Sequence, residues 1–180
     1  MNEHIRLVKP TTDLEEEYLD FYNEWKSNGG DMIPWVIKKD PNPFSKMVDS
    51  LLLAEKGENL PNGWVPDSTY WLVSESDRIL GVVNIRHSLT EKLSQNGGHI
   101  GYGIRPSERR KGFATKLLTL SLQKAHSIGI GQVLIVCDAW NKPSERTILS
   151  ADPVRDEDFI EEDGNVIFRY WVDTKGRNWE

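Results

Sequence analysis

The stretch that decides the fold runs from residue 98 to residue 115 and reads GHIGYGIRPSERRKGFAT. Its first part, His99–Ile104, is strand-like, and a polar turn follows at residues 106–112. The two glycines inside the strand, Gly101 and Gly103, predict either a β-bulge or a backbone that another segment approaches closely.

A helix is expected from Phe113, because apolar and small side chains recur at helical spacing. These side chains are Ala114, Leu117, Leu118, Ser121, Leu122, Ala125 and Ile128. The next apolar run, Val133–Cys137, is typical of a strand that is buried on both faces. The order over residues 99–138 therefore predicts a strand–helix–strand unit with parallel strands and a right-handed crossover.

The remaining chain adds elements on both sides of this unit. Helices are expected at residues 14–26, 44–56 and 141–149, and strands at 5–8, 69–73, 78–86 and 165–172. Residues 59–67 and 90–98 are expected to be connections, and residues 156–163 form an acidic stretch. The two N-terminal helices could form a lid over a substrate, and plain packing on the core is an equally open interpretation.

Composition limits the function. The 180 residues suit one domain, and 38% apolar with 28% charged residues is typical of a soluble globular protein. The net charge of −6 argues against a nucleic-acid partner, since phosphate binding needs a basic face. No apolar run reaches the length of a membrane span, and Met1–Arg6 lacks the apolar core of a signal peptide. A cytoplasmic protein is expected.

Cysteine and histidine provide no metal site. The single cysteine, Cys137, lies in an apolar run, so it is expected to be a buried structural residue rather than a nucleophile. The four histidines, His4, His87, His99 and His126, are scattered along the chain. We therefore expect no metal and no internal disulfide.

The polar turn before the helix has the properties of an anion site. A helix N-terminus exposes unpaired N–H groups and a partial positive charge, which suit a diphosphate. Gly112 lets the backbone approach such a ligand, Ala114 is small, and three basic residues add positive charge: Arg109, Arg110 and Lys111. A basic, solvated turn that merely opens a helix is the alternative interpretation.

Residues 69–149, and the stretch quoted above in particular, resemble the GNAT superfamily of N-acetyltransferases, especially a bacterial branch of predicted acetyltransferases. The resemblance implies a GNAT-like α/β fold, with a mixed, mostly antiparallel central sheet and helices on both faces. The strands that start at His99 and Gln132 would splay apart to form an acetyl-CoA slot. Main-chain groups around Ile104 would pair with the pantetheine arm and stabilise the oxyanion. The pyrophosphate would be held by N–H groups of residues 110–115, namely Arg110, Lys111, Gly112, Phe113, Ala114 and Thr115.

A second segment is similar to the family's next coenzyme-contacting region. Asn141 and Ser144 follow the buried strand in an N-x-x-S pattern, although such residues also cap helices. The chain departs from the family further on. It has Ile148 where many relatives carry a tyrosine as general acid, and Asp152-Pro153 where a glycine pair or Gly-Phe is common.

Catalysis needs an acceptor for the amine proton and a donor for the departing thiolate. His99 is the candidate base, because histidine titrates near neutral pH, and Tyr102 is the candidate acid. Strand alternation places His99 on the opposite face from Tyr102 and Ile104, unless a bulge at either glycine changes the phase. A purely structural role is an alternative for each.

These observations predict one acetyltransferase domain over residues 1–180. Residues 1–68 would supply variable N-terminal helices and a lid, residues 69–149 the acetyl-CoA-binding core, and residues 150–180 a C-terminal strand region. The expected function is acetyl transfer from acetyl-CoA to a primary amine by direct attack, with no metal and with a possible homodimer. Two alternatives are a non-catalytic acyl-CoA-binding module and an acyltransferase that uses a longer acyl donor.

Overall fold

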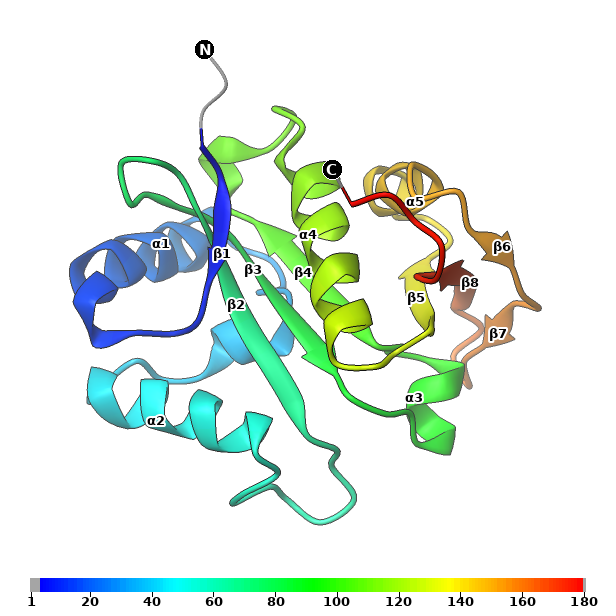
Figure 1. Ribbon diagram of the computed structural model, residues 1–180, viewed down its shortest axis with the longest axis horizontal. Helices are drawn as coiled ribbons and strands as arrows, with labels where there is room; N and C mark the ends of the chain where they lie inside the picture. The colour runs from blue at the N-terminus through cyan, green and yellow to red at the C-terminus, as the bar shows by residue number, and fades with distance from the viewer. Residues whose placement is uncertain (1–3, 180) are drawn as a thin grey trace.

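The computed structural model describes residues 4–179 as two antiparallel sheets with helices packed around them (Figure 1). Residues 1–3 and 180, which the expected domain includes, lie outside the described residues. The first sheet has the order β1 (Arg6–Val8), β2 (Asp67–Val73), β3 (Ile79–Arg86) and β4 (Ile100–Ile104). In the second sheet, β8 (Val166–Asp173) pairs with β5 (Gln132–Asp138), β6 (Val154–Arg155) and β7 (Phe159–Ile160).

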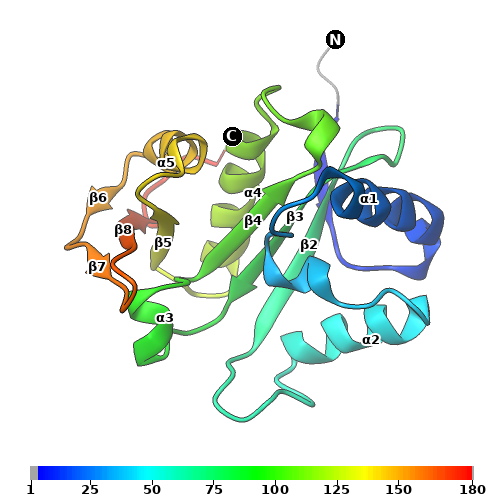
Figure 2. The same cartoon turned by 180° about the vertical axis from the view of Figure 1, so that it is seen from behind.

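Five α-helices surround the sheets in the described part of the chain, and short 3₁₀ turns lie at Thr12–Leu14, Trp35–Lys38 and Pro106–Glu108. The helices are α1 (Glu15–Asn28), α2 (Phe44–Glu55), α3 (Glu91–Gln95), α4 (Phe113–Ser127) and α5 (Lys142–Leu149). Helices α1 and α2 lie beside the first sheet away from α4, as the two opposite views show (Figures 1 and 2).

Alternation along β2 explains why the first sheet carries helices on both faces. Trp71 and Val73 belong to the core beneath α1 and α2, whereas Tyr70 and Leu72 belong to the core beneath α4. All four side chains are buried, so the C-terminal half of this strand is a continuous apolar run. The expected arrangement of helices on both faces is confirmed.

Helix α1 packs through three aromatic side chains at positions i, i+3 and i+7: Tyr18, Phe21 and Trp25. Tyr18 stacks on Trp71 of β2, with 4.7 Å between the ring centroids. Burial of large aromatic side chains therefore fixes this helix against the sheet. Helix α4 packs on the other face through five buried residues: Leu117, Leu118, Ser121, Leu122 and Ala125.

The structure departs from the sequence-based expectation in three places. The connection over residues 90–98 contains α3, which begins where the Thr90 hydroxyl accepts a hydrogen bond from the Leu93 N–H (3.2 Å). Strand β6 directly precedes the acidic stretch and β7 lies within it, and neither strand was expected. Ile128, expected on the buried stripe of α4, lies beyond the end of the helix and is 44% exposed.

Candidate active site

The two sheets touch where β4 begins beside the middle of β5. The N–H of His99 donates to the Leu134 carbonyl (2.8 Å), and the N–H of Leu134 donates to Nδ1 of His99 (2.9 Å). Gly98 is required here, because a Cβ would lie 2.6 Å from the Leu134 carbonyl oxygen. Within residues 4–179, no ladder pairs β4 with β5, so the expected parallel pair is replaced by this single junction. The strands splay beyond it, as expected.

The edge of β4 that faces the splay pairs with no other strand in the described part of the chain. The N–H of Arg105 donates to the Leu80 carbonyl (2.8 Å), which fixes the phase of the β3–β4 ladder. Because backbone groups alternate in direction along a strand, those of Tyr102 and Ile104 point away from β3. Nε of Arg109 donates to the Ile104 carbonyl (3.2 Å). The edge therefore leaves main-chain groups around Ile104 directed into the splay, and their pairing with a pantetheine arm, which the resemblance implies, stays a prediction.

The two strand glycines are explained by close approach rather than by a bulge. A Cβ on Gly103 would lie 1.8 Å from the carbonyl oxygen of Ile33, and one on Gly101 would lie 3.3 Å from Cβ of Pro34. The β3–β4 register runs without a shift from Ile100 to Ile104, so the alternative of a bulge is wrong. The segment that contains Ile33 and Pro34 thus covers one face of β4.

The turn before α4 is open at the helix N-terminus. Arg110 and Gly112 have positive φ angles of 63° and 85°, and Gly112 is the N-cap residue. A Cβ on Gly112 would meet nothing within 4 Å. The first helical backbone bond of this turn is donated by Lys116 to the Gly112 carbonyl (3.2 Å), so the preceding N–H groups have no acceptor within the helix. This geometry suits an anion.

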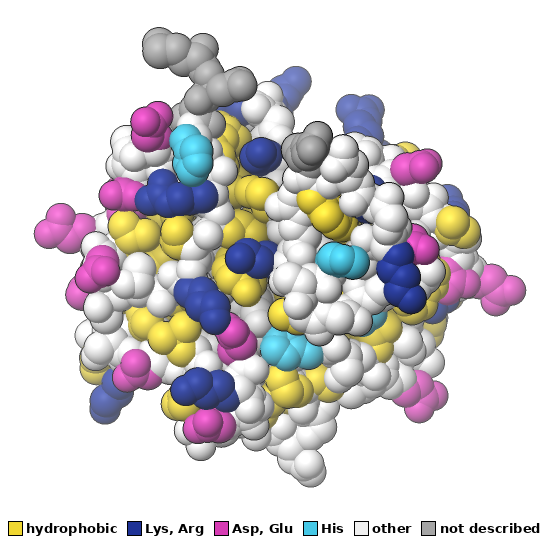
Figure 3. All heavy atoms as spheres, viewed as in Figure 1, with side chains coloured by type: hydrophobic (Ala, Val, Ile, Leu, Met, Phe, Trp, Pro, Cys, Tyr) yellow, Lys and Arg dark blue, Asp and Glu magenta, His cyan; other side chains and the backbone are white. Residues whose placement is uncertain are grey.

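The three basic residues of the turn differ in their contacts. The Arg109 guanidinium lies over the Trp25 ring, 4.7 Å from its centroid. Nζ of Lys111 forms an ion pair with Glu108 (2.8 Å). Arg110 is exposed and has no hydrogen bond or ion pair with any described residue. Basic and acidic side chains are interspersed over the face that Figure 3 shows, and no large patch of one charge stands out on it.

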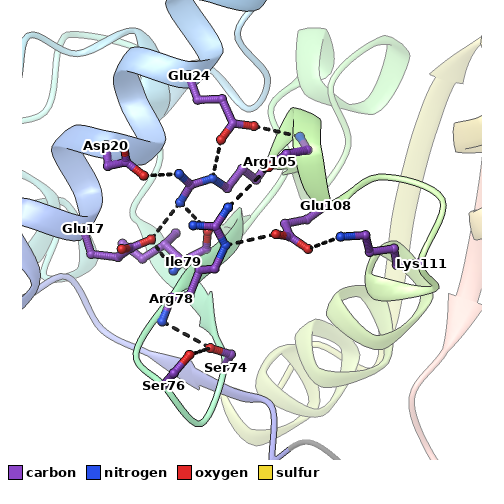
Figure 4. Close-up of polar contacts among 11 residues, drawn as sticks. Glu17, Asp20, Glu24, Ser74, Ser76, Arg78, Ile79, Arg105, Glu108 and Lys111 are labelled. Carbon is purple, nitrogen blue, oxygen red and sulfur yellow. Dashed lines mark hydrogen bonds and ion pairs between the residues drawn. The ribbon is translucent and has the colours of Figure 1, made fainter.

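A buried arginine joins α1 to the start of this turn (Figure 4). Arg105 is 1% exposed and forms ion pairs with Glu17 (2.7 Å), Glu24 (2.6 Å) and Asp20. Spacing of three and four residues puts the three carboxylates on one face of α1. Glu24 also accepts from the Ser107 N–H (2.7 Å). Sequence analysis missed this cluster, although the helical spacing of the three acidic residues along α1 was a readable signal.

A second ion-pair network continues from the cluster toward α4 (Figure 4). Glu108 accepts from Nε of Arg78 (2.9 Å) and from Nζ of Lys111 (2.8 Å), and its side chain is only 12% exposed. Arg78 lies in the connection between β2 and β3. The turn is therefore tied to the first sheet as well as to α1.

Tyr102 and Ser144, predicted from separate motifs, lie together. The Tyr102 hydroxyl is 3.2 Å from the Ser144 hydroxyl and 3.4 Å from the Ser144 carbonyl oxygen. Asn141 is the N-cap residue of α5, and its side-chain oxygen accepts from the Ser144 N–H (3.2 Å). Burial raises the pKa of Tyr102 to about 12, so its phenol is neutral at physiological pH. The asparagine therefore positions Ser144, which in turn contacts the phenol.

A family model described as the acetyltransferase (GNAT) domain matches residues 4–152. The chain belongs to the GNAT acetyltransferase family. No curated protein sequence matches it.

Solved structures share the fold of this GNAT chain. The microcin C7 self-immunity acetyltransferase MccE, in complex with acetyl-CoA and AMP, is 18% identical, with a TM-score of 0.69 over 96% of this chain and 93% of the other. The ribosomal L7/L12 α-N-protein acetyltransferase RimL, in complex with coenzyme A, is 14% identical, with a TM-score of 0.69 over 94% and 93%. A chimera of the Vibrio cholerae spermidine N-acetyltransferase SpeG with hSSAT is 11% identical, with a TM-score of 0.64 over 94% and 96%.

His99 of this GNAT chain is constrained at the junction of the strands. Burial, together with the nearby positive charge of Arg86, lowers the pKa of His99 to about 4. Since Nδ1 accepts the Leu134 N–H, the proton of the neutral ring sits on Nε2. Neither ring nitrogen then has a free lone pair, which favours the structural role over that of a base.

Two further side chains that bear on the expected chemistry are buried. Cys137 is 7% exposed, and burial raises the pKa of its thiol to about 11, so it is the buried cysteine that was expected. Ile148, at the position of the family's tyrosine, is fully buried in the core beneath α4. Among the described residues, no group of His, Cys, Asp or Glu could hold a metal ion. Nor does any helix within residues 4–179 have the length and apolarity to cross a membrane.

Proposed function

We propose that this chain transfers the acetyl group of acetyl-CoA to a primary amine by direct attack. The observation that carries the proposal is the splay of β4 from β5, which opens beside the uncapped N-terminus of α4. An extended thioester arm fits an open strand edge, and a diphosphate fits a helix N-terminus. The proteins of similar fold that were solved with acetyl-CoA or coenzyme A support the same donor.

The turn at residues 109–115 holds the pyrophosphate in this proposal. N–H groups of Phe113, Ala114 and Thr115 point out of the helix end, and the space above Gly112 is open. Arg110 supplies a cation that no described residue engages, and Lys111 supplies a second one if it leaves Glu108. The residues present therefore fit the coenzyme.

The pantetheine arm pairs with the backbone of Tyr102 and Ile104 along the free edge of β4. The Arg109 side chain already donates a hydrogen bond to the Ile104 carbonyl. Either Arg109 moves when the ligand binds, or the ligand pairs with the Ile104 N–H alone. The same N–H can stabilise the oxyanion that forms when the amine attacks the thioester carbonyl. This arrangement needs no covalent enzyme intermediate.

Tyr102 protonates the thiolate as the C–S bond breaks, and the phenol regains a proton from solvent. The amine loses its proton to water, because His99 has no free lone pair for it. Asn141 and Ser144 hold the phenol in place. His99 joins the strands, and the segment that contains Ile33 and Pro34 forms the wall beside β4.

Turnover tests the proposal. Acetyl-CoA is incubated with amines of different classes, a polyamine, a peptide with a free N-terminus and free lysine among them, and released thiol is measured. Tyr102→Phe should reduce kcat at least tenfold without weakening acetyl-CoA binding, because it removes only the proton donor. Absence of thiol release with every amine, together with acetyl-CoA binding that needs the turn, would instead identify a non-catalytic acyl-CoA-binding module.

Two further expectations stay predictions. Comparing acetyl-CoA with longer acyl-CoA donors tests the acyl-chain preference. Light scattering tests the homodimer. The negative charge of the chain argues that the acceptor is not a nucleic acid.

A further inference from the structure

A cavity of about 260 Å³ lies away from the splayed strands, between α2, the loop that follows it and the start of β2. This loop runs along the lower edge of the molecule in Figure 1. Trp35 and Trp64 line the cavity, with their rings edge to face and 4.7 Å between centroids. Trp64 is 48% exposed, so the cavity has an aromatic wall that is open to solvent.

Asp67 supplies a buried carboxylate to the same cavity. The residue is 2% exposed and lines the cavity. Its Oδ1 accepts from Nδ2 of Asn84 (2.5 Å), whereas no described residue donates a hydrogen bond to its Oδ2. Burial raises the pKa of this carboxyl, which is the result expected when too few donors stabilise the charge.

Asn84 shows the same shortage of donors one strand away. It is fully buried, and its Nδ2 bonds both Asp67 and the Thr69 hydroxyl (3.2 Å). Its Oδ1 has no hydrogen-bond partner among the described residues. A buried polar group without a partner is costly. Asn84 does not line the cavity, so Asp67 is the member of this pair that a ligand in the cavity could reach.

We propose that this cavity binds an organic ammonium ion, at a site separate from the acyl-transfer slot. An ammonium group brings three N–H donors and a positive charge to Asp67, and an aromatic face attracts a cation. The carbon chain of such a ligand would lie against Trp35 and Trp64. The site does not depend on the proposed acetyl transfer, because it lies two strands from β4.

Lys39 is an internal cation next to this site. It lines the cavity, and its Nζ lies 5.4 Å from the centroid of the Trp35 ring. Its charge also acts on Asp67. Lys39 therefore competes with an external ammonium for the same aromatic face and the same carboxylate.

Calorimetry with n-butylammonium at neutral pH tests the proposal, and n-butanol serves as its neutral counterpart. We expect saturable binding of the cation, at least tenfold tighter than that of the alcohol. Asp67→Asn should weaken cation binding at least tenfold, and Lys39→Met should tighten it. Asp49→Asn is the matched control, because this exposed carboxylate lines the same cavity; it should change the affinity less than threefold.

Equal affinity for the alcohol, or unchanged affinity in Asp67→Asn, would overturn the proposal. If Asp67→Asn does not fold, Trp64→Ala is the test of the cation site. Removal of this half-exposed ring should weaken cation binding several-fold and leave the core intact. Unchanged binding in Trp64→Ala would reject the site. None of these measurements uses acetyl-CoA, so their failure is distinct from failure of the proposed enzyme activity.

Discussion

The connection between β4 and α4 contains two arginines whose environments differ. Arg105, at the end of β4, is buried and fully engaged by three carboxylates of α1. Arg110, five residues later, is exposed, has a left-handed backbone and contacts no charged partner among the described residues. A guanidinium that is already satisfied holds the scaffold, whereas one that is free is available to a ligand. The predictions below test whether Arg105 stabilises the fold while Arg110 serves the ligand.

The largest effect is expected from Arg105→Gln. Removing one member of a buried ion-pair cluster leaves charges without a partner, although these carboxylates can regain some water because they are at least a quarter exposed. The free energy of unfolding should fall by about 3 kcal/mol. Urea unfolding measures this loss. Arg110→Gln is the matched control and should change stability by less than about 0.5 kcal/mol. Equal losses of stability in the two variants would refute the separate roles of Arg105 and Arg110.

His99 should make stability depend on pH. Its pKa is about 4 in the folded chain, against the ordinary value of 6.5. The unfolded chain therefore binds more protons between these values, so stability is fully present above pH 6.5 and is lost as pH falls toward 4. The loss should be on the order of 3 kcal/mol. His99→Gln should flatten the pH dependence of urea unfolding over this range.

The same histidine can be tested in catalysis. If His99 were the base, His99→Ala would remove the acidic limb of the pH–rate profile while coenzyme binding stayed unchanged. With Nδ1 held by Leu134, we expect the limb to survive. Loss of the limb in a variant that still binds acetyl-CoA would restore histidine as the base.

Gly112→Glu should abolish the thermal shift that acetyl-CoA causes. The substitution places a negative charge where the phosphates would lie, and a φ of 85° also strains any residue that has a Cβ. Gly112→Asn separates the two effects, since asparagine tolerates a left-handed backbone and carries no charge. It should keep most of the shift. An unchanged shift with glutamate would place the coenzyme elsewhere.

Local patterns predicted the elements better than the contacts between them. The glycines of β4, the helix from Phe113 and the polar turn before it were all readable, because each depends on a few adjacent residues. The partners of Gly103 and Arg105 were not, since Ile33 and the acidic face of α1 lie about 70 to 90 residues away in sequence. His99 shows the same limit: its type suggested a base, but only the position of Leu134 shows that Nδ1 is occupied.

The smallest effect separates Arg110 from its neighbour. Arg110→Ala should weaken acetyl-CoA binding by roughly 1 kcal/mol, a typical value for a partly exposed charge-assisted contact. Lys111→Ala should cost less, because Lys111 must first leave Glu108, to which it is paired at 2.8 Å. Both effects should shrink as salt screens the polyanionic ligand. Titrations of each variant at low and high ionic strength measure these losses of affinity.

The ion pair between Lys111 and Glu108 can be tested directly. In a Glu108→Gln background Lys111 is released, so Lys111→Ala should then cost as much binding free energy as Arg110→Ala. Equal costs in the original background would show that the ion pair with Glu108 does not hold Lys111 back from the ligand.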